Sequence, residues 1–229
     1  MQFAVDNKNT RLCKDIFGNI YDVYHIPEGT IFQNLDLSGM DFAELPASLA
    51  TCAVLGKFNC SYCVNLTSLK NLPQGFKVLD CSNCWSLTSL RGIPESVSMV
   101  ICHDCRSLPT LIGLPPKLRN LDCRGCRSLP DFNGCNSEML EEVLCSSCTS
   151  IRSLRGIFSK RLRRIDFGLR PPVNLVEIPE HIPSEVVLGI SPGEIAFHKA
   201  CWGLNRELEK IKAKTMALFT AGAEKVNAR

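Results

Sequence analysis

The amino-acid sequence predicts a solenoid with a curved parallel sheet of short strands on its concave side and extended, polyproline-like returns on its convex side. Two observations lead to this prediction. Cys-x-x-Cys pairs recur at intervals of 21, 21, 21 and 22 residues: Cys60/Cys63, Cys81/Cys84, Cys102/Cys105, Cys123/Cys126 and Cys145/Cys148. Each pair also lies in the same frame of apolar residues, and self-similarity of this period is typical of repeat solenoids.

The apolar frame assigns a place to each cysteine. It reads L-x-x-L-x-C-x-x-C-x-x-L, as in the stretch from Leu118 to Leu129. A leucine-rich repeat reads L-x-x-L-x-L-x-x-N/C-x-L, at roughly 20 to 29 residues per unit. The first cysteine therefore takes an inward leucine position of a leucine-rich repeat solenoid. The second takes the position that Asn or Cys usually holds at the end of the strand.

The outer repeats indicate what the thiols do. Leu37 stands 23 residues before Cys60, and Phe167 stands 22 residues after Cys145, so apolar residues fill the cysteine position at both ends. A core-filling residue can be exchanged for Leu or Phe, whereas a metal ligand cannot. We therefore expect packing thiols, with no cofactor and no metal. A zinc or thiol-redox protein stays open as an alternative, because adjacent pairs match the spacing of four-cysteine zinc sites.

The segments between the strands are also stereotyped. A Leu-Pro or Ile-Pro dipeptide recurs at Leu72-Pro73, Ile93-Pro94 and Leu114-Pro115. Proline excludes a long helix, and the residue before it is pushed into an extended conformation. Three glycines, Gly92, Gly113 and Gly156, are predicted to form a tight turn in each return.

Three regions follow from this pattern. Residues 1–30 are predicted to cap the first repeat, with a short helix or strand over 15–20. Residues 31–190 hold about seven to eight repeat units of 21–23 residues. Residues 191–229 are predicted to be a C-terminal capping helix and tail, because Ser191-Pro192 resembles a helix start and apolar residues follow at helical spacing.

Composition narrows the function classes. The net charge of +3 is too small to indicate nucleic-acid binding by itself. No apolar run of 18 residues predicts a membrane span, and no basic start followed by an apolar stretch predicts a secretory signal peptide. We therefore expect a reducing compartment, in which the 14 cysteines stay free of disulfides.

With its Leu-Pro returns and its period, the chain resembles the LPX subtype of bacterial leucine-rich repeat proteins. The resemblance covers roughly residues 30 to 190, and the cysteines depart from the usual Leu and Asn. This subtype is typical of effectors that Gram-negative pathogens and symbionts inject into host cells. The resemblance implies delivery into the host cytoplasm by a secretion system and binding of a host protein.

Some members of this subtype carry a C-terminal ubiquitin-ligase domain with a catalytic cysteine. Only about 40 residues follow the last repeat here, too few for such a domain. The expected function is thus a non-catalytic protein-binding scaffold. The alternative is an adaptor or substrate-recognition part of a ubiquitin-ligase system. The sequence leaves the oligomeric state open.

The concave face is the predicted partner-binding site, because alternate side chains of each strand point outward there. The outward residues are Lys57, Asn59, Val78, Asp80, Met99, Ile101, His103, Asn120, Asp122, Arg124, Glu142, Arg164 and Asp166. They predict a mixed, mildly acidic strip with an apolar patch at its centre. Tyr62 and Trp85 lie nearby, and such residues often anchor interfaces.

A second candidate surface is electrostatic. Stacked repeats are expected to place Arg106, Arg127, Arg152 and Arg155 along one basic edge. Such an edge suits acidic protein, phosphoinositide or RNA, although a solubilising surface is the simpler interpretation. Few aromatic residues interleave with it, so nucleic acid is not the expected partner.

The sequence predicts no catalytic residues. Cys102 and His103 are adjacent and suggest a nucleophile and a base, but alternation along the strand turns them to opposite sides. No Gly-rich phosphate loop occurs either.

Overall fold

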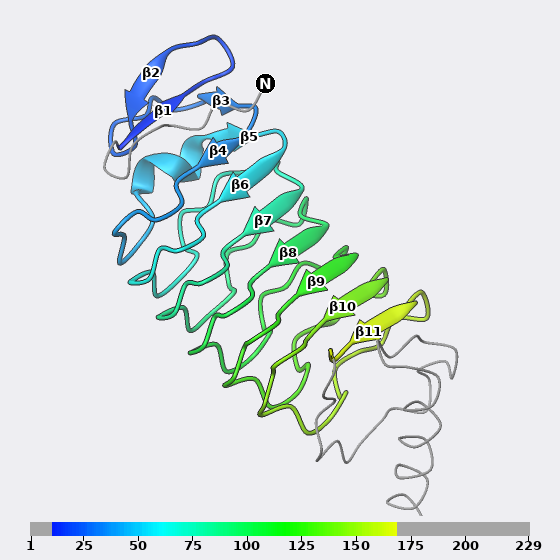
Figure 1. The fold of residues 1–229 in the computed structure, drawn as a ribbon. Coiled ribbons are helices and arrows are strands. Elements are labelled where there is room, and N and C mark those ends of the chain that lie inside the picture. The colour runs from blue at the N-terminus through cyan, green and yellow to red at the C-terminus, as the bar shows by residue number, and fades with distance from the viewer. Residues whose placement is uncertain (1–10, 169–229) are drawn as a thin grey trace, which may run out of the picture. The chain divides into compact units, whose positions relative to one another are not determined.

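A computed structural model of the chain describes residues 11–168. The described part is a parallel-sheet solenoid of about six turns, in which each turn contributes one short strand (Figure 1). This confirms the predicted repeat architecture. The predicted C-terminal capping helix, over 191–229, lies outside the described residues.

The main sheet has seven strands, and sequence neighbours pair in parallel throughout. In order they are β4 (Leu35–Asp36), β6 (Lys57–Asn59), β7 (Val78–Asp80), β8 (Met99–Ile101), β9 (Asn120–Asp122), β10 (Glu142–Leu144) and β11 (Arg164–Asp166). The residue at the centre of each three-residue strand is buried and packs beneath its counterpart on the next strand, as Leu79 does beside Val100. The strand period therefore matches the repeat period of the sequence.

The first cysteine of each pair forms a continuous buried column beside those central residues. The column runs through Leu37, Cys60, Cys81, Cys102, Cys123, Cys145 and Phe167. All seven side chains are at most 1% exposed, and the apolar residues at the two ends occupy the same position as the thiols. The prediction that these cysteines fill the core is confirmed.

The returns follow the prediction made from proline and glycine. Within residues 11–168 they contain no α-helix, and one 3-10 helix, η1 (Ala47–Thr51), begins directly after Pro46. Gly92 and Gly113 have backbone φ angles of +101° and +110°, which side-chain-bearing residues rarely adopt. No helix in the described part is long and apolar enough to cross a bilayer.

The N-terminal segment adopts strands rather than a helix. β1 (Leu12–Lys14) and β2 (Ile20–Asp22) form an antiparallel hairpin, and Asp15 accepts the backbone N–H groups of Phe17 and Asn19 in its turn. β3 (Ile31–Phe32) pairs in parallel with β5 (Ala53–Val54) beside the main sheet. The short helix or strand predicted over 15–20 is therefore not found: residues 15–19 form the turn that Asp15 organises, and β2 begins at Ile20.

Candidate functional site

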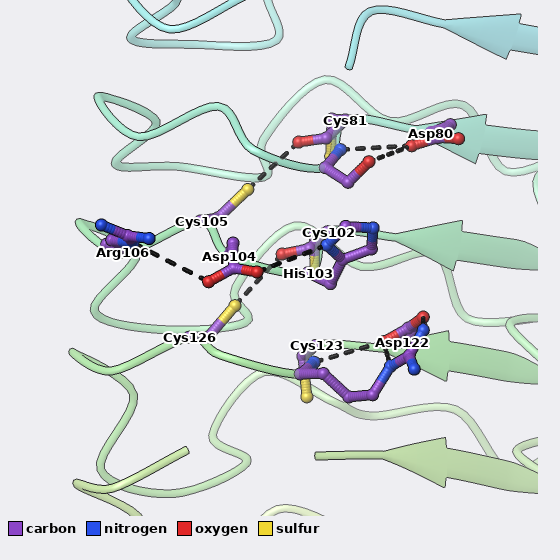
Figure 2. A network of polar contacts seen from close by, with 12 residues as sticks. Asp80, Cys81, Cys102, His103, Asp104, Cys105, Arg106, Asp122, Cys123 and Cys126 are labelled. Carbon is purple, nitrogen blue, oxygen red and sulfur yellow. Dashed lines mark hydrogen bonds and ion pairs between the residues drawn. The ribbon is translucent and has the colours of Figure 1, made fainter. Parts of the chain in front are cut away.

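The second cysteine of each pair closes a hydrogen-bonded ladder between repeats. Its thiol donates to the carbonyl oxygen of the residue in the buried column one repeat earlier, across sulfur–oxygen distances of 3.0–3.3 Å. The donors are Cys63, Cys84, Cys105, Cys126 and Cys148. Figure 2 shows two rungs, from Cys105 to Cys81 and from Cys126 to Cys102. The carbonyls of Leu37, Cys102 and Cys123 also accept a backbone N–H, so the thiol adds a second hydrogen bond there. At Cys60 and Cys81 the thiol supplies the hydrogen bond that a buried carbonyl requires.

The environment keeps the first cysteine of each pair protonated, whereas a hydrogen bond with that cysteine one repeat earlier lowers the pKa of Cys84 and of Cys148. A hydrogen bond with the second cysteine of the next repeat, together with burial, raises the pKa of Cys60 and Cys81 well above its ordinary value. Burial raises the pKa of Cys135 to about 12. A protonated thiol is a poor nucleophile and a poor metal ligand. Within residues 11–168, no three or more His, Cys, Asp or Glu side chains lie so that they could hold a metal ion.

The hydrogen bonds of the ladder are expected to stabilise the folded protein. The substitution Cys105→Ala should lower the free energy of unfolding by about 2 kcal/mol, because it leaves the Cys81 carbonyl unpaired and opens a small cavity. Cys105→Asn should cost less, because an amide N–H restores the donor at a position where repeats of this pattern accept Asn. Urea unfolding of both variants measures the difference. An Asn variant as unstable as the Ala variant would show that the hydrogen bond is unimportant.

The Cys102-His103-Asp104-Cys105 segment separates its reactive groups. The Cys102 side chain is fully buried, whereas the His103 imidazole is 31% exposed on the opposite side of the strand. Nδ1 of His103 lies 3.7 Å from Oδ2 of Asp104, so the imidazole faces a carboxylate and not a thiol (Figure 2). The predicted opposite orientation of Cys102 and His103 is confirmed.

We call the outward side of the main sheet, with the second residue after each strand, the strand face. Strand register stacks its side chains in three rows. The first row is Lys57, Val78, Met99, Asn120, Glu142 and Arg164. The second row is Asp36, Asn59, Asp80, Ile101, Asp122, Leu144 and Asp166. The third row, two residues beyond the last residue of each strand, contains His103 and Arg124. All thirteen predicted partner-binding residues therefore lie on this face.

The Asp and Asn residues of the second row form the turns that end the strands, a structural role that the sequence pattern alone did not predict. Each side-chain oxygen accepts the backbone N–H two residues later and ends its strand in a tight turn. The acceptors are Asp36, Asn59, Asp80, Asp122 and Asp166, at 2.7–3.3 Å. The signal was present as a recurrent Asp or Asn at one repeat position, because these residues favour turns of this kind. Ile101 and Leu144 are the apolar exceptions in the row.

Ion pairs cancel much of the charge on the strand face. Lys57 Nζ lies 2.8 Å from Asp80 Oδ2, and Arg124 forms two hydrogen bonds with Asp122, at 2.6 and 2.8 Å. Burial acts to raise the pKa of Asp80, but hydrogen bonds from Lys57 and Ser82 outweigh it, so the pKa lies below its ordinary value. The predicted mildly acidic strip is thus a set of locally neutralised pairs.

Apolar side chains occupy the middle of this face. Val78 and Met99 are register partners on β7 and β8, and Ile101 follows on β8 opposite Asp80. All three are half-buried. We call these three residues the apolar patch. The Lys57–Asp80 pair lies at one side of the patch and the Asp122–Arg124 pair at the other.

The four predicted basic-edge residues do not share one position. Arg106 and Arg127 each follow the second cysteine of their repeat directly, whereas Arg152 and Arg155 lie four and seven residues after Cys148. The carbonyl of Arg155 accepts the N–H of Phe132, which places Arg155 in a return turn. All four are exposed. The structure therefore separates Arg106 and Arg127 from the other two.

Comparison with known proteins does not place the chain in a family. No family model matches it, and a search of curated protein sequences finds no match. The class that the fold defines is a parallel-sheet repeat solenoid. Membership of the LPX leucine-rich repeats, with the effector role that it implies, stays a prediction from the repeat motif.

Proposed function

We propose that the protein is a non-catalytic scaffold that binds a partner protein through the strand face, with the apolar patch at the centre of the contact. The observation that carries the proposal is the apolar patch itself, flanked by ion pairs. Protein interfaces commonly have a core depleted of charge and a polar rim. The face has this composition around Val78, Met99 and Ile101.

The rigidity of the surrounding charges also supports binding. Lys57 and Arg124 are already held by carboxylates, and the aspartates are held by backbone N–H groups. A partner that docks against side chains already fixed in place loses less conformational entropy than one that must order them.

The nature of the partner comes from the repeat motif. The resemblance to LPX leucine-rich repeats supports a host-cell protein as the partner and an effector role for the chain. In that setting the solenoid acts by masking, recruiting or assembling its target.

A matched pair of substitutions tests the proposal. Ile101→Lys places a charge in the apolar patch, and Leu144→Lys places the same charge in the same row away from it. Both positions lie between two aspartates, Asp80 and Asp122 for the first and Asp122 and Asp166 for the second. Ile101→Lys should reduce capture of the partner from host-cell lysate by at least about tenfold, and Leu144→Lys should not.

The readout is crosslinked capture with quantitative mass spectrometry. The aspartates are left unchanged, because replacing them would break the strand-ending turns and confuse misfolding with lost binding. If Ile101→Lys captures the same proteins as the wild type in equal amounts, the strand face is not the binding surface.

A further inference from the structure

We propose a second docking surface, formed by Trp85, Arg106 and Arg127, that binds a carboxylate-rich segment of a partner protein. We call these three residues the rim row. The surface lies beyond the ends of the strands, so the proposal does not rest on the function assigned to the strand face. It assigns a ligand class to side chains that neither the core nor the strand face uses.

Repeat geometry brings the three side chains into line. Each residue directly follows the second cysteine of its repeat, in three consecutive repeats. The turns that carry them are hydrogen-bonded to one another, from Asn83 N to His103 O at 2.8 Å and from Asp104 N to Arg124 O at 2.6 Å. Neighbouring positions are therefore spaced by about one strand separation, about 4.8 Å.

Arg106 is held in place at the middle of the row. Its guanidinium carbon lies 5.2 Å from the centre of the Trp85 ring, and its Nε lies 3.8 Å from Oδ1 of Asp104. Figure 2 shows the side chain of Arg106 directed toward Asp104. About half of the Arg106 side chain, 51%, remains exposed to solvent. A pre-oriented guanidinium of this kind is well suited to bind a carboxylate, because less conformational freedom is lost.

The charge balance of the row favours an anionic ligand. Arg127 is exposed and has no ion pair within the described residues. The nearby Arg124 is already neutralised by Asp122, and Asp104 is the carboxylate that contacts the row. The row therefore keeps positive charge, and complementary charge promotes association.

The position of Trp85 favours a peptide over a nucleic acid as the ligand of the rim row. Single-stranded nucleic acids bind by stacking bases on open aromatic faces. Arg106 lies over a face of Trp85, so that face is not open to a stacking base. An exposed Trp beside Arg is, in contrast, the combination that often anchors protein segments. An acidic peptide is thus the ligand that the geometry fits.

The experiment uses the full chain and a defined probe, a blocked decapeptide of glutamate, with a uridine decamer as the nucleic-acid probe. Binding is followed at low salt by NMR, through the indole N–H of Trp85, which every variant keeps. Arg106→Gln/Arg127→Gln should weaken binding of the glutamate peptide by about tenfold. Arg91→Gln/Arg155→Gln changes the net charge equally at return turns and serves as the matched control. Ile101→Lys should bind the peptide as the wild type does.

The outcomes are distinct. Saturable binding of the glutamate peptide that only the rim-row variant loses supports the proposal. Absent binding overturns the proposal, and an equal loss in the Arg91/Arg155 control overturns it in favour of unspecific attraction. Tighter binding of the uridine decamer through the same two arginines overturns it in favour of nucleic acid. Failure of the strand-face variants to affect partner capture would leave this result unchanged, so the two proposals can fail separately.

Discussion

The substitution Gly113→Ala is expected to lower the free energy of unfolding by at least about 3 kcal/mol, because it adds backbone strain and a steric clash. The φ angle of Gly113 is +110°, outside the region that alanine tolerates. An added Cβ would also lie 2.5 Å from the backbone nitrogen of Arg91 in the preceding turn. A backbone atom cannot rotate away as a side chain can, so the two turns would have to separate.

Repeat architecture makes this local change costly for the whole domain. Each repeat contacts only its neighbours, so opening one interface uncouples the repeats on either side. Gly39→Ala is the matched control, because Gly39 also has a positive φ, +71°, but has nothing within 4 Å of an added Cβ. It should cost only the left-handed strain, about 1–2 kcal/mol. Equal midpoints for the two variants in urea unfolding, followed by circular dichroism, would refute the close approach of the turns.

Alkaline pH is expected to unfold the solenoid through its buried thiols. Burial raises the pKa of Cys13, Cys63 and Cys135 from 9.0 to about 12. The folded state therefore holds these protons more tightly than the unfolded state. The stabilisation is complete below pH 9, the ordinary thiol pKa, and is lost as pH rises toward 12.

The expected loss is large. Each of these thiols contributes a little over 1 kcal/mol per pH unit in this range, so the three together contribute about 4 kcal/mol per pH unit. Because domains are stable by only about 5–15 kcal/mol, unfolding should be complete before pH 12. Urea unfolding at increasing pH, with a phosphine reductant present, measures the effect. Constant stability up to pH 11 would mean that the thiols ionise in the folded state, and the metal and redox alternatives would regain support.

The repeat architecture could be predicted because each of its determinants is tied to a position in the period. The buried column appears as Cys60 and its equivalents, with Leu37 and Phe167 at the ends, and the return turns appear as glycines. Such patterns are visible in the sequence because every repeat buries the same positions against its neighbours. The N-terminal hairpin has no repeat to compare with, so its strands could not be told from a helix.

The contents of the candidate site were harder to predict than its location. Alternation placed Asp80 and Asp122 on the strand face, but their roles as turn formers depend on a hydrogen bond to the backbone two residues later. The thiol of Cys105 and the carbonyl of Cys81 meet only through the register between two repeats. The basic edge combined two repeat positions, because Arg155 lies in a return turn whereas Arg106 directly follows the second cysteine of its repeat.

Contact at the strand face itself is the central claim, and site-specific photocrosslinking tests it most directly. A benzoylphenylalanine residue replaces Ile101 in the apolar patch or, as the control, Ile112, an exposed apolar residue of a return turn. Irradiation in host-cell lysate should give a discrete protein adduct from position 101 that Met99→Lys in the same chain abolishes, and no such adduct from position 112. The same adduct from both positions, or an adduct from position 101 that persists with Met99→Lys, would contradict binding through the strand face.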